Sequence, residues 1–215
     1  MGDYKRNQAL EAISVALGQG RAPSLALHTE IRRLLDADRS LRRSASSKDP
    51  ASMRYAFFSG EAPGRGAEVY FSSYEVFALL KALDLMHHGW PQATAVKIMR
   101  QARPLLESKH EYILHLDPAE LFDEKRIREI TERSSATVST TYPLYLVISS
   151  RKGRTLQNVR DETREVVVLE NEELMPFMLR EAGISFTVME LTRQAYDLQA
   201  ALAKTTPSKR GRGNA

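Results

Sequence analysis

The chain has 215 residues, of which 42% are hydrophobic and 27% are charged. This amount of apolar side chain supports one sizeable core, or two small cores divided by a linker, and excludes a wholly disordered protein. The absence of cysteine excludes disulfide frameworks, cysteine-ligated zinc and thiol catalysis. The net charge of +4 and the pI near 9.3 are mildly basic, which permits nucleic-acid binding without demonstrating it.

Positive charge is concentrated in two stretches, as contact with phosphate requires. The tail after Asp197 contains four cations and no acid. The other stretch contains Arg32, Arg33, Arg39, Arg42, Arg43, Lys48 and Arg54. No segment has the pattern of a signal peptide or of a membrane span, so we expect a location in the cytoplasm, at the bacterial nucleoid, and no membrane partner.

Two helices are predicted at the N-terminus. Gln8–Leu17 has apolar residues on one helical face and stops at the GQG of residues 18–20, where glycine ends a helix easily. After this turn, Ser24–Ala37 is predicted to form a second helix with a basic exposed face. Its apolar stripe consists of Leu27, Ile31, Leu34 and Leu35.

A hairpin is predicted next, after the polar connector Ser40–Ser52. Met53–Ser59 and Ala67–Ser72 are rich in Tyr, Phe and Val, and they flank the loop GEAPGRG. Arg65 lies between two glycines at the tip, where it could contact a phosphate backbone. The alternative is a surface hairpin that carries one unrelated arginine.

Helical spacing resumes after the hairpin. Ser73 is expected to cap a helix that ends at His88-Gly89, and Trp90-Pro91 then leads into a helix over Gln92–Leu106. Pro104 predicts a kink or an early stop in that helix. We expect an extended segment over His110–Leu116 and a charged surface helix from Asp117 to Glu132.

The character of the sequence changes near Ser134, where we place a domain boundary. Strands are predicted at Leu144–Ser150 and Glu165–Glu170, and a helix at Glu172–Glu181. A last helix over Ser185–Lys204 has apolar residues spaced by three and four, which favours a homodimer. The alternative is a single amphipathic helix that packs on its own domain. The residues of this seam are Val188, Leu191, Ala195, Leu198 and Leu202.

The order helix, turn, helix, hairpin, helix, helix resembles the DNA-binding domain of the mercury-resistance-regulator (MerR) family. The junction Phe71–Met99 is similar to that family's pattern of aromatic residue, Ser, acid, aliphatic, Leu-rich helix, Gly and second helix. Residues of the matching type are Phe71, Ser72, Glu75, Val76, Leu79, Gly89, Val96 and Ile98. This chain differs from the family at two places. It has Val69 where the family usually has Arg, and the first helix of this chain lacks the family's Gly-Val turn.

The resemblance implies that the second helix enters the major groove, with Ser24, His28, Arg32 and Arg33 as candidates for contacts to bases or phosphates. Arg54 and Arg65 are the basic residues closest to the expected wing. The fold class is therefore α+β, mainly α with β-hairpins. We expect a winged helix-turn-helix domain with a helical extension at 1–133, an α+β dimerisation or effector domain at 134–204, and a disordered basic tail at 205–215.

The chain lacks the local motifs of common catalytic sites. Its five histidines show no metal-ligand spacing such as HExxH, and the loop GEAPGRG lacks the GK[ST] ending of a phosphate-binding loop. We expect no metal, no cofactor and no enzymatic activity. The favoured function is a sequence-specific, dimeric transcriptional regulator that binds double-stranded DNA. Two alternatives are a protein interaction or assembly module and a nucleic-acid enzyme whose site the spacing does not reveal.

Overall fold

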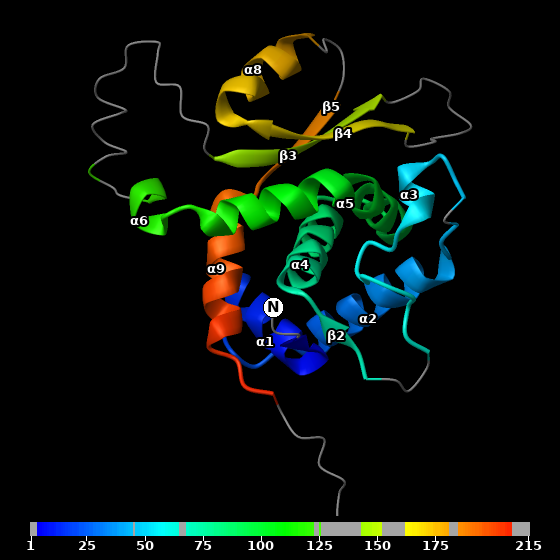
Figure 1. The fold of residues 1–215 in the computed structure, drawn as a ribbon, viewed down its shortest axis with the longest axis vertical. Coiled ribbons are helices and arrows are strands. Elements are labelled where there is room, and N and C mark those ends of the chain that lie inside the picture. Colours follow the sequence, from blue (N-terminus) through cyan, green and yellow to red (C-terminus); the bar gives the residue numbers. More distant parts are fainter. Residues whose placement is uncertain are drawn as a thin grey trace, which may run out of the picture. The chain divides into compact units, whose positions relative to one another are not determined.

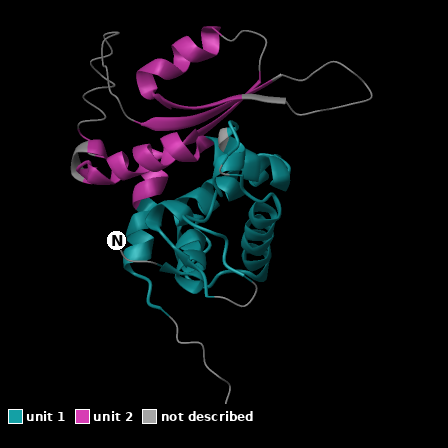
Figure 2. Cartoon of the chain, turned by 45° about the vertical axis from the view of Figure 1, so that its right-hand side comes forward, with its two compact units in different colours: residues 1–101, 197–215 teal, residues 102–196 magenta. Residues whose placement is uncertain are grey.

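The computed structural model describes residues 4–44, 46–64, 68–122, 125, 143–151, 162–180 and 185–207. These residues form a mixed α+β protein with many helices and two small antiparallel sheets (Figure 1), which confirms the fold class at this level. The chain divides into two compact units, one formed by residues 1–101 and 197–215 and the other by residues 102–196 (Figure 2). The boundary predicted near Ser134 lies outside the described residues, and the division at 133/134 stays a prediction.

The first unit is built around one buried helix. Nearly every residue of α4 from Tyr74 to Leu83 is buried, and α1 and α2 pack against this helix. Such a helix has no polar face and can exist only inside a core. The bounds of the helices in this part are α1 (Arg6–Ala16), α2 (Leu25–Ser40), α3 (Pro50–Met53), α4 (Ser73–His87) and α5 (Gln92–His115).

Local signals set the ends of α4. Ser72, one residue before the expected cap, accepts a hydrogen bond from the backbone N–H of Glu75, and Glu75 accepts one from the N–H of Ser72. This reciprocal pair satisfies two of the donors that the first turn leaves free. The helix ends before Gly89, whose φ of +89° is a conformation that glycine adopts easily.

The predicted hairpin between 53–59 and 67–72 is wrong. Strand β2 contains only Tyr70–Phe71 and pairs with β1 (Tyr4–Lys5), far away in the sequence. The segment expected to form the first hairpin strand has four consecutive buried residues, Tyr55 to Phe58, whereas a strand directs neighbours to opposite faces. Arg65, at the expected tip, lies outside the described residues.

Helix α5 continues through Pro104, so the predicted stop and the extended segment over 110–116 are wrong. Pro104 is exposed, while Leu106, His110 and Ile113 repeat at helical spacing on the buried side. Burial of this stripe favours a continuous helix even though proline removes one backbone hydrogen bond. A short helix, α6 (Pro118–Leu121), follows, and most of the predicted helix up to Glu132 lies outside the described residues.

The second unit contains an antiparallel sheet in the order β4-β3-β5. Its strands are β3 (Leu144–Arg151), β4 (Glu162–Glu170) and β5 (Ser185–Glu190), and α8 (Asn171–Arg180) follows β4. The two predicted strands and the helix after them are confirmed. Within this unit, α8 covers one face of the sheet and the second part of α5 lies at the other (Figures 1 and 2). Lys109 on α5 forms an ion pair of 3.3 Å with Glu170 at the end of β4.

The last predicted helix starts too early. Residues Ser185–Glu190 form β5 on the edge of the sheet, where Val188 is opposite Val147, and α9 covers only Thr192–Ala203. The hydroxyl of Thr192 accepts a hydrogen bond from the backbone N–H of Leu144 at 3.0 Å, which joins the start of α9 to β3. The helical residues of the expected seam, Ala195, Leu198 and Leu202, are buried in the chain itself, as is Leu191. The homodimer stays a prediction.

Candidate nucleic-acid interface

Helix α2 has two chemically distinct sides. Its buried side carries Leu27, Ile31, Leu34, Leu35 and also Asp38. Its outward side carries exposed residues at three- and four-residue spacing, beginning with Leu25, of which 83% is exposed, and continuing with His28 and Arg32. Arg33 is exposed beside this strip. The structure therefore brings His28, Arg32 and Arg33, three of the six predicted DNA contacts, onto one outward side.

The other predicted contacts have different positions. Ser24 is the N-cap of α2, and its hydroxyl oxygen accepts a hydrogen bond of 3.1 Å from the backbone N–H of Leu27. This bond starts the helix and makes Ser24 a positioning residue. Arg54 is exposed directly after α3.

Two arginines that the sequence pattern did not single out as contacts join this region. Arg6 is the first residue of α1, directly after the strand that pairs with β2. Burial lowers the pKa of Arg6, and the positive charges of Arg32 and Arg39 lower this pKa further. The negative charge of Asp36 raises the pKa of Arg6. Arg32, Asp36 and Arg39 are spaced by four and three residues on α2 and therefore lie on one side of that helix. We call these three residues, together with Arg6, the arginine cluster. It contains three guanidinium groups and one carboxylate.

The neighbours of Arg39 hold its side chain in place. Its Nη1 donates a hydrogen bond of 2.8 Å to Oδ1 of Asp36, and its guanidinium lies 5.7 Å from the centre of the Phe58 ring. Its Nε is buried and has no hydrogen-bond partner among the described residues. A guanidinium that packs on an aromatic ring loses less freedom on binding than one that is fully solvated.

Arg6 and Arg32 differ from Arg39 in their pairing. Among the residues that the structure describes, neither forms an ion pair. The nearby Lys5 differs, because its ammonium group pairs with Glu68 at 2.7 Å and the hydroxyl of Tyr70 donates to the same carboxylate at 2.9 Å. The hydrogen bond to Glu68 is also the main reason why the pKa of Lys5 is raised. The surplus of positive charge therefore lies at Arg6 and Arg32.

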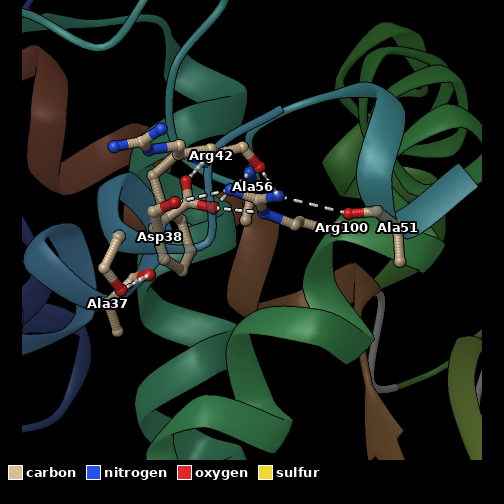
Figure 3. A network of polar contacts seen from close by, with 8 residues as sticks. Ala37, Asp38, Arg42, Ala51, Ala56 and Arg100 are labelled. Atoms are coloured by element: carbon tan, nitrogen blue, oxygen red, sulfur yellow. Dashed lines mark hydrogen bonds and ion pairs between the residues drawn. The ribbon is translucent and has the colours of Figure 1, made fainter. Parts of the chain in front are cut away.

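A buried ion pair anchors the C-terminal end of α2 (Figure 3). Arg100 on α5 donates from Nε to Oδ1 of Asp38 at 2.6 Å, and both side chains are almost completely buried. The carboxylate of Asp38 also accepts hydrogen bonds from the backbone N–H groups of Ala56 and Phe57, at 3.1 and 3.0 Å. These bonds use the amides that a hairpin ladder would need, which is a further reason why residues 54–59 form no strand.

The remaining donors of Arg100 bind backbone carbonyl groups. Its Nη1 lies 2.7 Å from the carbonyl oxygen of Arg42 and 3.3 Å from that of Ala51, and its Nη2 binds the carbonyl of Asp38. The guanidinium also lies 5.1 Å from the centre of the Tyr55 ring. Arg100 therefore joins α2, the segment after it and α5, and it holds the basic side of α2 on a fixed support.

Comparisons with protein-family models, with curated proteins and with solved structures found no match. Within the described ranges, no group of three or more His, Asp or Glu side chains could hold a metal ion. None of the helices in the described part of the chain is long and apolar enough to cross a bilayer.

Proposed function

We propose that this chain binds double-stranded DNA through the outward side of α2 together with the arginine cluster. The observation that carries the proposal is that Arg32 and Arg39 lie on the side of α2 that also carries the strip of exposed residues, and that Arg39 is held there by Asp36 and by the Phe58 ring. A surplus of cations is costly in the free protein, and a polyanion relieves it by replacing the counterions that the cations attract.

The shape of α2 suits the major groove of DNA. Its 16 residues span about 24 Å, and a groove about 12 Å wide accepts one helix. His28, Arg32 and Arg33 would reach base edges or phosphates, and arginine is suited to guanine because its planar fork matches two acceptors. Leu25 would offer an apolar contact to a thymine methyl group near the start of the helix.

Sequence-specific contacts of this kind support a role as a transcriptional regulator. A homodimer would place two copies of α2 on a palindromic site, one helical turn of DNA apart. It would need a contact other than the expected seam, because Leu191, Ala195, Leu198 and Leu202 are buried in the chain itself. The helix, turn, helix part of the family resemblance suggests the same use of the second helix. The hairpin wing is not part of the proposal, because β2 pairs with β1 instead.

The test is a fluorescence-anisotropy titration of a labelled random-sequence duplex, followed by selection of preferred sequences. Replacing Arg32 and Arg33 by Ala should weaken binding, because each good base contact contributes about 1–3 kcal/mol of discrimination. The matched control replaces Lys97 and Arg180, two exposed cations outside the proposed interface, and removes the same charge. Equal losses in the two double variants would indicate nonspecific attraction, and unchanged affinity for the α2 variant would eliminate α2 as the contact.

One observation favours a second candidate function, a protein interaction with a second copy of the chain. Met175 and Leu179 on α8 are 59% and 73% exposed and lie four residues apart, on one side of the helix. Exposed apolar side chains in such an arrangement favour protein contact. Sedimentation velocity of the wild type and of a variant with Ser at both positions tests this function. A dimer that dissociates in the variant supports it, and a wild-type monomer excludes it.

A further inference from the structure

We propose that Asp36 acts as an internal substitute for a DNA phosphate. In the free protein its carboxylate binds Arg39, and in the complex a phosphodiester group of the DNA backbone takes its place between Arg6, Arg32 and Arg39. This inference rests on the proposed DNA-binding function and assigns a backbone contact within it.

The ion pair between Asp36 and Arg39 is well formed but easy to exchange. The 2.8 Å distance between Nη1 and Oδ1 is that of a good charge-assisted hydrogen bond. The side chain of Asp36 is 60% exposed, however, and no other hydrogen bond to it is found among the described residues. Exposed pairs of this kind contribute little free energy, so Asp36 can turn into solvent at small cost.

The arginines of the cluster have donors that Asp36 does not use, among them Nε of Arg39. Asp36 binds a single arginine through one hydrogen bond, whereas Arg6 and Arg32 have no ion pair in the described part of the chain. A phosphodiester shares one negative charge between two non-bridging oxygens, and its tetrahedral shape allows several guanidinium groups to donate to it from different directions. Phe58 keeps Arg39 in position when Asp36 leaves.

A simpler interpretation is that Asp36 and Arg39 form an ordinary ion pair between residues i and i+3 that stabilises α2. Such a pair contributes a few tenths of a kcal/mol to a helix. It would not connect the two residues in DNA binding. The two interpretations therefore differ in one measurable quantity, which is the coupling between Asp36 and Arg39 in the affinity for DNA.

The experiment measures affinity for a labelled random-sequence duplex at low salt, using the full chain and the variants D36N, R39Q and D36N/R39Q. We expect D36N to bind DNA roughly two- to fivefold more tightly than the wild type. The wild-type chain must first break its exposed ion pair, and pairs of this kind contribute a free energy that corresponds to this range. In the R39Q background most of this gain should disappear, because the hydrogen bond through which Asp36 occupies Arg39 is then absent. E30Q is the matched control, since it removes a carboxylate from the same helix at a position with no ion pair among the described residues.

Two results would overturn the inference. Unchanged affinity of D36N would show that the carboxylate does not compete with phosphate. An equal gain in D36N, in E30Q and in D36N/R39Q would show that the effect is only the loss of negative charge. Both results leave the proposed function intact if R32A/R33A still weakens binding, whereas a wild-type chain that fails to bind duplex DNA overturns the function and the inference together.

Discussion

Two aspartates of helix α2 form ion pairs with arginines, and these pairs differ in burial and, we expect, in function. In the buried pair, Nε of Arg100 lies 2.6 Å from Oδ1 of Asp38. Three backbone carbonyl groups accept further hydrogen bonds from Arg100, and two backbone N–H groups donate to Asp38. In the other pair, Nη1 of Arg39 lies 2.8 Å from Oδ1 of Asp36, and the side chain of Asp36 is 60% exposed. The distances are nearly equal, so the distance between the charges does not distinguish a structural pair from an exchangeable one.

Burial distinguishes them through the free energy of solvation. A charge left alone in the interior loses the water that would otherwise stabilise it, and breaking a buried pair costs about 3–5 kcal/mol. At the surface, water replaces the lost partner, and the same change costs about 0.2–1 kcal/mol. We therefore expect one side of α2 to hold the unit together and the other to exchange partners.

The largest expected effect comes from breaking the buried pair. Asp38→Ala should lower the free energy of unfolding by about 3–5 kcal/mol, because it leaves the guanidinium of Arg100 buried without its carboxylate. Urea denaturation of this variant beside the wild type measures the loss. The double variant Asp38→Leu/Arg100→Met should recover part of it, since no charge then stays buried. A loss below about 1 kcal/mol in the single variant would contradict the assignment of a structural pair.

The buried imidazole of His110 in the second unit should make the stability of the protein depend on pH. Burial lowers the pKa of His110 to about 4, from an ordinary value of 6.5. The folded chain thus keeps the imidazole neutral where the unfolded chain protonates it. Stability from this residue is complete above pH 6.5 and is lost as the pH falls toward 4, by about 3 kcal/mol in total.

His115 provides the matched control for this prediction, because it lies on the same helix and is exposed. Unfolding free energies of the wild type, His110→Gln and His115→Gln should be measured between pH 7 and pH 4. The His110 variant should lose much of the pH dependence over this range, and the His115 variant should keep it. Equal slopes in all three proteins would show that the imidazole of His110 is readily protonated in the folded chain.

An intermediate effect is expected for Arg6 on α1, the member of the arginine cluster that lies outside α2. Arg6→Ala should weaken DNA binding about uniformly across sequences and reduce the slope of log K against log salt by about 0.9, the value for one phosphate contact. Anisotropy titrations at several salt concentrations give this slope. Arg21→Ala is the control, because Arg21 already pairs with Glu11. A changed sequence preference with an unchanged slope would show that Arg6 contacts bases instead.

The smallest effect is expected for the surface pair itself. Asp36→Asn should change the free energy of unfolding by less than about 1 kcal/mol, because the side chain of Asp36 is 60% exposed and exposed ion pairs contribute little. Urea denaturation compares it with Asp38→Asn, which is the same substitution two residues further along the helix. Similar losses in the two variants would remove the distinction between the sides of α2.

Much of the secondary structure could be predicted from local sequence. The spacing of Leu27, Ile31 and Leu34 indicates the buried side of α2, and the β-branched runs indicate β3 and β4. The exposed side of α2 follows from the same spacing, and with it the positions of His28, Arg32 and Arg33. Proline at position 104 was a weaker guide, because a long apolar stripe outweighed its local effect.

Two features depend on contacts between distant parts of the chain. Tyr70–Phe71 pairs with Tyr4–Lys5, and Asp38 binds the amide groups of Ala56 and Phe57. The first pairing also sets the place of Arg6, which has no sequence signal as a member of the arginine cluster. Side-chain periodicity reports which face of an element is buried, and this is a local property of the sequence. Strand partners and ion pairs depend instead on which segments meet when the core forms, and the tertiary structure alone decides them.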